Sequence, residues 1–263
     1  MTALLRPNEG MRVEYQRELE ALIDTMDASL SYWIIRTYRR TMPILVTDSA
    51  ADVLSATILA HGKRWVDRIE KLGPQLARKF ARVTQERVDA QAVTMMRTAG
   101  FTVRFKMTPG EQSVVDAIVH ENVALIRSIA EQHLSGVEQA VMRSVQRGRD
   151  MSALSIELRE VYGVTHRRAA FIARDQNSKA TGLLARARFM ELGLTEGVWK
   201  HSGGGKVPRP EHVAMSGQRF NLEEGAFLEG VWTWPGVEIN CRCVLGPYIP
   251  GVTVVKGIKP KLR

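Results

Sequence analysis

The C-terminal part of the sequence contains side chains that can ligate a soft metal ion. Cys241 and Cys243 are separated by one residue, so in an extended segment both sulfurs point to the same side. With His212, and with His201 as a further candidate, they could form a Cys2His or Cys2His2 zinc site. Alternatively, the cysteines are small buried apolar residues and His212 is a hydrogen-bonded core residue. No second cysteine pair lies at ligand spacing. We therefore expect no metal or other cofactor, and keep zinc at His212, Cys241 and Cys243 as the alternative.

A cysteine beside a histidine could also act as a nucleophile. Cys241 would have to be partly exposed in an electropositive setting, and Arg242 is next to it. Nothing else in the sequence assembles an oxyanion hole, and the common catalytic signatures are missing. Residues 203–206 (GGGK) lack the Ser or Thr and the following helix that a phosphate-binding loop requires. We therefore expect no enzyme and no catalytic residue, with a Cys/His-dependent enzyme module as the least favoured alternative.

Two predicted helices, residues 152–162 and 165–176, resemble a helix-turn-helix. Gly163-Val164 would be the turn and Thr165 the N-cap of the second helix, on which Arg167, Arg168 and Arg174 could contact phosphate. The second helix is predicted to continue to about residue 192, longer than a recognition helix usually is. A helix-turn-helix DNA-binding protein is therefore the alternative function from another class.

Basic residues dominate the charge of the chain. There are 37 Lys and Arg against 28 Asp and Glu, which gives a formal net charge of +9. Such a chain is attracted to polyanions, and DNA or an acidic protein surface is the natural partner. The candidate contact residues are Lys63, Arg64, Arg68, Arg78, Lys79, Arg82 and Arg87, together with Arg167 and Arg168. An ordinary solvated helix face is the alternative, because Asp67, Glu70, Glu86 and Asp89 could pair with these bases.

Apolar residues recur at helical spacing through most of the first 192 residues. This pattern predicts helices over residues 13–38, 51–71, 75–98, 111–147, 152–162 and 165–192. Gly73-Pro74 is expected to break the second helix from the third. Residues 101–107 (FTVRFKM) alternate between apolar and polar residues, which predicts a half-buried strand.

The composition changes after Gly193. Three of the five tryptophans lie here, together with short apolar runs such as GVWKH, GVWTW and CRCVL, which is typical of short strands and turns. Trp199, Trp232 and Trp234 are expected to supply buried area. Residues 251–263 carry four basic and no acidic side chains and are expected to form a basic tail.

The 263 residues are long enough to bury a substantial core. The predicted elements indicate an α+β protein, in which an elongated and mostly helical N-terminal region precedes a compact C-terminal module with short strands. The chain has only two cysteines, and this low number is typical of proteins in a reducing compartment. No segment approaches the ~20 apolar residues of a membrane helix. The first residues lack the apolar core of a signal peptide, so we expect synthesis and use in a cytoplasm.

Several of these features occur in an order that resembles a known family. A long helix contains Glu121-Asn122 and residues 125–129 (LIRSI), and the next helical stretch contains Arg168-Ala169 and residues 172–174 with Asn177. The most specific element is Arg209-x-x-His212, with Gly217 and Phe220, followed after Pro235 by residues 240–243 (NCRC). Residues 101–250 are similar in this respect to the phage Mu F-like minor head proteins, or head morphogenesis proteins, of tailed bacteriophages.

This resemblance implies a minor capsid component that works by binding. Its implied partners are the portal protein, the major capsid or scaffolding protein, and non-specific double-stranded DNA. Its implied place is the capsid interior near the portal vertex, after assembly in the host cytoplasm. Residues 1–165 would be the helical docking region, residues 166–250 the Mu F-like module and residues 251–263 the tail. In the module, Arg209, His212, Gly217, Asn240, Cys241 and Cys243 would be structural and hold loops in place.

Overall fold

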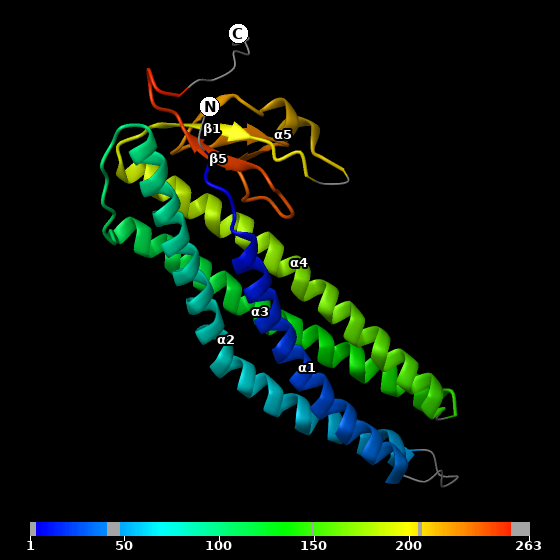
Figure 1. Cartoon of the computed structure of the whole chain (residues 1–263). Helices are drawn as coiled ribbons and strands as arrows, with labels where there is room; N and C mark the ends of the chain where they lie inside the picture. Colours follow the sequence, from blue (N-terminus) through cyan, green and yellow to red (C-terminus); the bar gives the residue numbers. More distant parts are fainter. Residues whose placement is uncertain (1–3, 41–47, 149, 205–206, 254–263) are drawn as a thin grey trace. The chain divides into compact units, whose positions relative to one another are not determined.

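The computed structural model describes residues 4–40, 48–148, 150–204 and 207–253 (Figure 1). Four long helices are followed by short antiparallel strands, so the expected α+β class is confirmed. The helices are α1 (Glu9–Arg40), α2 (Asp48–Thr98), α3 (Pro109–Gln146), α4 (Met151–Glu191) and the short α5 (Pro210–Ala214). The strands are β1 (Glu196–Lys200), β2 (Arg219–Asn221), β3 (Ala226–Leu228), β4 (Val231–Thr233) and β5 (Val244–Pro247). Most of the expected basic tail lies outside the described residues.

The chain divides into two compact units that are not consecutive in sequence. The sheet unit comprises Met1–Val13, Arg78–Val119 and Ala173–Arg263, and the helical unit comprises Glu14–Ala77 and His120–Ile172. The expected limit between residues 165 and 166 lies inside α4, which is continuous there. The division into a docking region and a C-terminal module therefore stays a prediction about function.

The helical unit is held together by a stripe of buried residues along α1. The stripe runs at spacings of three and four residues, and each member is no more than 2% exposed: Tyr15, Leu19, Ile23, Met26, Leu30 and Ile34. Two buried hydroxyls at the ends of this helix have polar partners on α3. The Tyr15 hydroxyl donates to Asn122 Oδ1 at 2.8 Å, and the Tyr38 and Ser144 hydroxyls lie 2.6 Å apart. Both tyrosine hydroxyls therefore keep a hydrogen-bond partner although they are buried, as buried polar groups usually do.

The expected break at Gly73-Pro74 is wrong, because α2 continues through both residues as one helix of 51 residues. Proline removes one N–H donor and disfavours a helical conformation in the residue before it. The flanking residues Ile69 and Ala77 are buried, and a Cβ on Gly73 would lie in ordinary contact with Ile126. Packing on both sides of the proline therefore outweighs the local preference for a break.

The helix-turn-helix interpretation is also wrong, since α4 runs without a turn from Met151 to Glu191. Thr165 is not an N-cap. Its hydroxyl donates to the Val161 carbonyl four residues earlier, as a threonine inside a helix does. Buried residues on both sides of Gly163, such as Leu158 and Ala169, hold the helix through the glycine.

Residues 101–107 do not form the expected strand. They link α2 to α3 without regular secondary structure, and no strand pairs with them in the described part of the chain. Phe101 and Met107 are about half exposed, whereas the Phe105 ring packs beneath the Arg188 guanidinium at 4.6 Å. Of the alternating apolar residues, Phe105 thus packs on a residue of α4, and none of them pairs in a sheet within the described ranges.

The sheet unit contains a three-stranded antiparallel sheet in the order β2-β1-β5 and a separate β3-β4 hairpin. Val198 in the central strand pairs with Arg219 on one side and Gly246 on the other. The hairpin turns through Glu229 and Gly230, which both have positive φ, as a two-residue turn that matches strand twist requires. Trp199 is fully buried, but Trp232 is 57% exposed, so the expectation that Trp232 supplies buried area is wrong.

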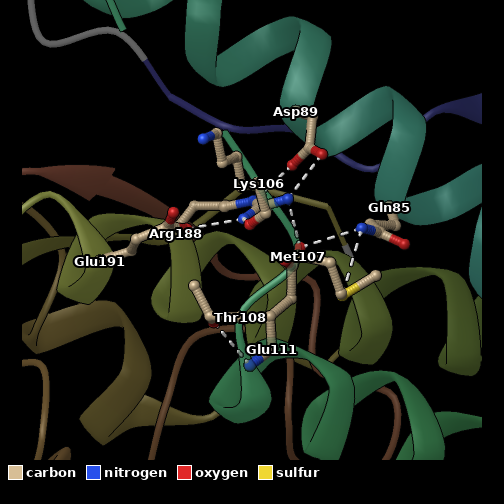
Figure 2. A network of polar contacts seen from close by, with 8 residues as sticks. All are labelled: Gln85, Asp89, Lys106, Met107, Thr108, Glu111, Arg188 and Glu191. Carbon is tan, nitrogen blue, oxygen red and sulfur yellow. Dashed lines mark hydrogen bonds and ion pairs between the residues drawn. The ribbon is translucent and has the colours of Figure 1, made fainter. Parts of the chain in front are cut away.

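A buried arginine joins four segments of the sheet unit (Figure 2). Arg188 on α4 is 1% exposed, and its guanidinium donates to both carboxylate oxygens of Asp89 on α2, at 2.6 and 2.7 Å. It also donates to Glu191 at 2.6 Å, to the Lys106 carbonyl at 2.9 Å, and pairs with Glu111 at the start of α3. One cation thereby connects α2, the segment that links α2 to α3, α3 itself and α4.

The carboxylates around this arginine outnumber it. Burial raises the pKa of Glu111, and the nearby charges of Asp89 and Glu191 add to the increase that Arg188 opposes. Burial alone would lower the pKa of Arg188, but the hydrogen bonds to Asp89 and Glu191 outweigh it and raise this pKa. Gln85 donates to Glu111 at 3.1 Å, and the Thr108 hydroxyl caps the start of α3 by accepting from the Glu111 N–H. The network is therefore extended by neutral groups.

None of the helices in the described ranges contains a stretch long and apolar enough to cross a bilayer.

The same substitution, glycine to alanine, is expected to have opposite effects on stability at two positions of α4. Gly163→Ala should stabilise the protein by about 0.5–1 kcal/mol, because the site is a helix interior with room for a methyl group. Gly182→Ala should destabilise it by about 1–3 kcal/mol or more, because the new Cβ would meet the Pro235 carbonyl oxygen. Urea unfolding of both variants measures the difference. A destabilised Gly163→Ala protein would indicate a turn at this position.

Loss of the buried cation should be costly. Arg188→Met should destabilise the protein by about 3–5 kcal/mol, because Glu111 would remain buried without its partner. The double variant Arg188→Met/Glu111→Gln should recover part of this loss, as a double-mutant cycle by denaturant unfolding would measure. The matched control is Arg82→Ala, which removes the exposed Arg82–Glu86 pair and should cost about 0.5 kcal/mol or less. Equal effects of the two single variants would contradict the assigned role of the network.

Candidate functional site

The three side chains that sequence analysis kept as the alternative zinc set, His212, Cys241 and Cys243, lie together in the sheet unit. His212 comes from α5, which begins with Pro210 at its first turn, and both cysteines come from the segment that leads into β5. His212 Nδ1 lies 3.5 Å from Cys241 Sγ and 3.7 Å from Cys243 Sγ. All three side chains are buried, at 2%, 4% and 4% exposure. The structure thus brings together residues separated by about thirty positions in sequence.

The central strand supplies one wall of this cluster. The Trp199 ring meets His212 edge-on at 5.1 Å between ring centroids and also contacts Phe220. The Trp199 carbonyl accepts a hydrogen bond from the Gly217 N–H at 2.7 Å. Gly217 has a φ of +90°, a conformation that L-residues rarely adopt, so glycine is favoured at this position. Trp199 and Gly217 therefore fix the side of the cluster formed by α5.

The other wall is a turn, residues 235–240, packed closely on α4. A Cβ on Gly236 would lie 2.8 Å from the Ser178 carbonyl oxygen, and one on Gly182 would lie 2.3 Å from the Pro235 carbonyl oxygen. Two glycines, one on each side of the contact, thus allow the backbones to touch. Asn240, with a φ of +59°, donates its backbone N–H to the Asp175 carboxylate on α4. The direction in which Cys241 enters the cluster is set by these contacts.

Arg209 connects α5 to the same turn. Its guanidinium donates to the Ile239 carbonyl at 3.1 Å and pairs with Glu229 at 3.2 Å. Arg209 is hydrogen-bonded to the turn at Ile239, and Asn240 lies within the turn. Both positions agree with a role in holding the loops in place. That structural role remains a proposal for the motif residues as a group.

The two thiols do not have the same acidity. A hydrogen bond from the Cys243 thiol lowers the pKa of Cys241 to about 5, and backbone N–H donors and His212 add to the effect while burial opposes it. The same thiol hydrogen bond and burial raise the pKa of Cys243. The pair can therefore hold one negative charge at neutral pH, and a second negative charge would need a nearby cation. His212 Nε2 is buried and has no hydrogen-bond partner in the described part of the chain.

A cavity of about 460 Å³ borders the cluster. Its walls include the three motif side chains His212, Cys241 and Cys243, and cationic side chains line it more than acidic ones: Arg174, Arg209 and Arg242. His201 also lines the cavity, but its Nδ1 accepts a hydrogen bond from the Gly203 N–H at 3.1 Å. Among the described residues, His212, Cys241 and Cys243 are the one group of three or more His, Cys, Asp or Glu side chains whose ligand atoms all lie within 4.8 Å of one another, and His201 is not part of it.

The basic residues expected to face a polyanion lie on two helices. All seven on α2 are exposed; three belong to the helical unit (Lys63, Arg64 and Arg68) and four to the sheet unit (Arg78, Lys79, Arg82 and Arg87). Arg82 pairs with Glu86 at 2.8 Å, and the Arg68 guanidinium covers the Trp65 ring. On α4, Arg167 is exposed, whereas Arg168 is half-buried and donates to the Ser128 hydroxyl at 2.9 Å.

The Arg188 network is the feature that sequence spacing did not predict. Arg188 lies 77 positions from Glu111 and 99 positions from Asp89, so no local pattern joins it to these two partners. One signal was available: Arg188 continues a stripe of buried residues on α4 that contains Leu184 and Ala185. A charged residue on an apolar helix face requires buried partners, although the sequence does not say which ones.

Comparisons with known proteins point to one family. Residues 135–246 match the family described as Phage Mu protein F like protein. The matched range contains α4 with Arg188, the strands β1 to β4, β5 up to residue 246, and the complete Cys/His cluster. A protein of Haemophilus influenzae, named only as uncharacterized, is 36% identical over 142 residues, which is 54% of this chain and 31% of the relative. The chain thus spans about a third of the length of that relative. No solved structure matches the chain significantly.

Proposed function

Since residues 135–246 belong to the phage Mu protein F-like family of head morphogenesis proteins, we propose that this protein is a minor capsid component of a tailed bacteriophage. In this proposal it binds the portal protein during head assembly, contacts the major capsid or scaffolding protein, and lies in the capsid interior near the portal vertex. It acts by binding and catalyses no reaction. The family match carries the proposal, because the match includes α4, nearly all of the sheet and the complete Cys/His cluster.

An exposed aromatic pair in the matched region is the surface that we assign to the portal. Phe227 on β3 and Trp232 on β4 are 59% and 57% exposed, and their rings contact each other at 5.5 Å between centroids. Val231 beside them is also exposed. Tryptophan and other aromatic anchors contribute most of the binding free energy at many protein interfaces. A rigid two-residue turn presents this pair, so little conformational entropy would be lost on binding.

The basic side chains of α2 support a second contact, with the packaged DNA. Arg64, Arg78 and Arg87 are exposed, and no ion pair of theirs is found among the described residues. Exposed arginines of this kind bind phosphate without reading base sequence. A net charge of +9 acts in the same direction.

Co-purification with the portal tests the first contact. The full chain and the portal of the same phage should form a complex, and Phe227→Ala/Trp232→Ala should weaken it roughly 30-fold, the loss of about 2 kcal/mol of anchor contacts. Stability should change by about 0.5 kcal/mol or less, because both rings are exposed. Leu59→Ala, which removes an exposed apolar side chain of α2, is the matched control. A complex unaffected by the double variant would reject this hairpin as the portal surface. A protein that is absent from heads and does not bind the portal would reject the function.

Salt dependence tests the DNA contact. Binding to duplexes of unrelated sequence should have equal affinity, and the logarithm of affinity should fall linearly with the logarithm of salt concentration. The variant Arg64→Gln/Arg78→Gln/Arg87→Gln should reduce this slope by about 0.9 for each phosphate contact that is lost. Arg143→Gln, whose arginine is held by Glu157, is the control and should leave the slope unchanged. A preference for one short duplex, or an unchanged slope in the triple variant, would contradict the proposal.

A further inference from the structure

We propose that His212, Cys241 and Cys243 form a zinc site, in which His212 Nδ1 and the two sulfurs are three ligands and the fourth position faces the adjoining cavity. The sequence left zinc as the less favoured interpretation, because one Cys-x-Cys and one distant histidine do not specify a site. The tertiary arrangement reverses that preference. This inference concerns the cluster itself and does not depend on portal or DNA binding.

The two nitrogen–sulfur distances in the cluster match those of a tetrahedral zinc site. Zinc bonds of about 2.3 Å to sulfur and about 2.0–2.1 Å to nitrogen place neighbouring sulfur and nitrogen ligands about 3.6 Å apart. His212 Nδ1 lies 3.5 and 3.7 Å from the two sulfurs, and all three ligand atoms are within 4.8 Å of one another. A zinc ion could therefore be bound with little movement of these side chains.

Hydrogen bonds within the cluster do not fully satisfy the two ring nitrogens of His212 and the two sulfurs. The Cys243 thiol donates to the Cys241 sulfur, and His212 Nδ1 has a single hydrogen-bonding position in the ring plane, so it can bond to only one of the two sulfurs with good geometry. His212 Nε2 is buried without a hydrogen-bond partner among the described residues, so the ring obtains little compensation for its burial. A cation shared by Nδ1 and both sulfurs would use the lone pair and both sulfurs simultaneously.

The chemical types of the three ligand atoms, one imidazole nitrogen and two sulfurs, indicate which metal ion would bind. Thiolate and imidazole ligands favour zinc over calcium or magnesium, which prefer oxygen ligands. A divalent cation also balances the charge of two buried thiolates, which the surroundings otherwise oppose because the sulfurs lie so close together. A reducing compartment, which the low cysteine content favours, keeps both thiols available for the metal.

The fourth position is assigned to an exchangeable ligand. Among the described residues, the group of ligand atoms contains three members, and His201 is engaged by the Gly203 N–H at the cavity wall. Arg174, Arg209 and Arg242 make that wall cationic. A water molecule or a small anion is the ligand that such a wall accepts.

Metal analysis of the full chain, purified with a phosphine reductant, tests the assignment. We expect one zinc per chain, and cobalt(II) substituted for it should show tetrahedral d–d bands and thiolate charge-transfer absorption. Adding azide should shift the d–d bands, because the fourth position is open. A chain that binds no zinc and gives only octahedral cobalt spectra would overturn the site, and bands insensitive to azide would overturn the open position.

Ligand variants locate the site. Cys241→Ser, Cys243→Ser and His212→Ala should each lower zinc affinity by on the order of 100-fold or more, beyond the loss typical of residues that only orient ligands. Arg242→Ala, between the two cysteines but exposed, and His201→Ala should retain zinc with affinity changed by less than about 10-fold. A His201→Ala protein that lost zinc like the ligand variants would overturn the three-residue assignment. If a ligand variant does not fold, the cobalt spectrum of the wild-type chain decides the question.

Discussion

A guanidinium can be buried only where carboxylates and carbonyl oxygens replace the water that it loses, and Arg188 imposes this requirement on the sheet unit. Its partners come from α2, from the residues just before α3, from the first turn of α3 and from α4 itself. Each of these segments must reach the same point. The network therefore specifies where they lie, in addition to any stability that it provides.

The end of α4 that carries Arg188 is followed in the chain by β1. Both α4 and β1 contact the candidate site. β1 contributes Trp199, which packs against His212. On α4, Gly182 has no side chain, and this allows the backbone of Pro235 to pack closely against the helix. The turn that follows delivers Cys241 and Cys243 to the histidine. A helix held by a buried ion pair thus supports the central strand on one side and the cysteine-bearing turn on the other. Each of the three side chains of the site is consequently buried and packed against its neighbours, which suits a structural or metal-binding role.

The proposed functions separate by location in the molecule. The exposed aromatic pair of the β3-β4 hairpin is assigned to a protein partner, and the exposed arginines of α2 are assigned to DNA. The Cys/His cluster is buried, so it cannot itself form a broad contact with either partner. A zinc ion there would stabilise the turn and α5 together, and its open position would be reached only through the cavity.

The sequence by itself determined the elements whose signals are local. Periodic apolar residues predicted α1 and α3 closely, and the change in composition after Gly193 predicted short strands. Local signals failed at Gly73-Pro74 and at Gly163, where a preference worth about 1–3 kcal/mol was outweighed by the burial of residues on both sides. They also failed at residues 101–107, because alternation cannot create a strand without a neighbouring edge.

The spacing of Cys241 and Cys243 identified the cluster, but only the tertiary structure decided that His212 lies within 3.5–3.7 Å of both sulfurs and that His201 does not belong to the set. It alone decided that Trp232 is exposed and that Arg188 meets Asp89 from 99 positions away. The physical reason is the same in each case. A sequence pattern reports the preferences of neighbouring residues, whereas burial, charge compensation and ligand distances are set by segments that meet only after the chain has folded.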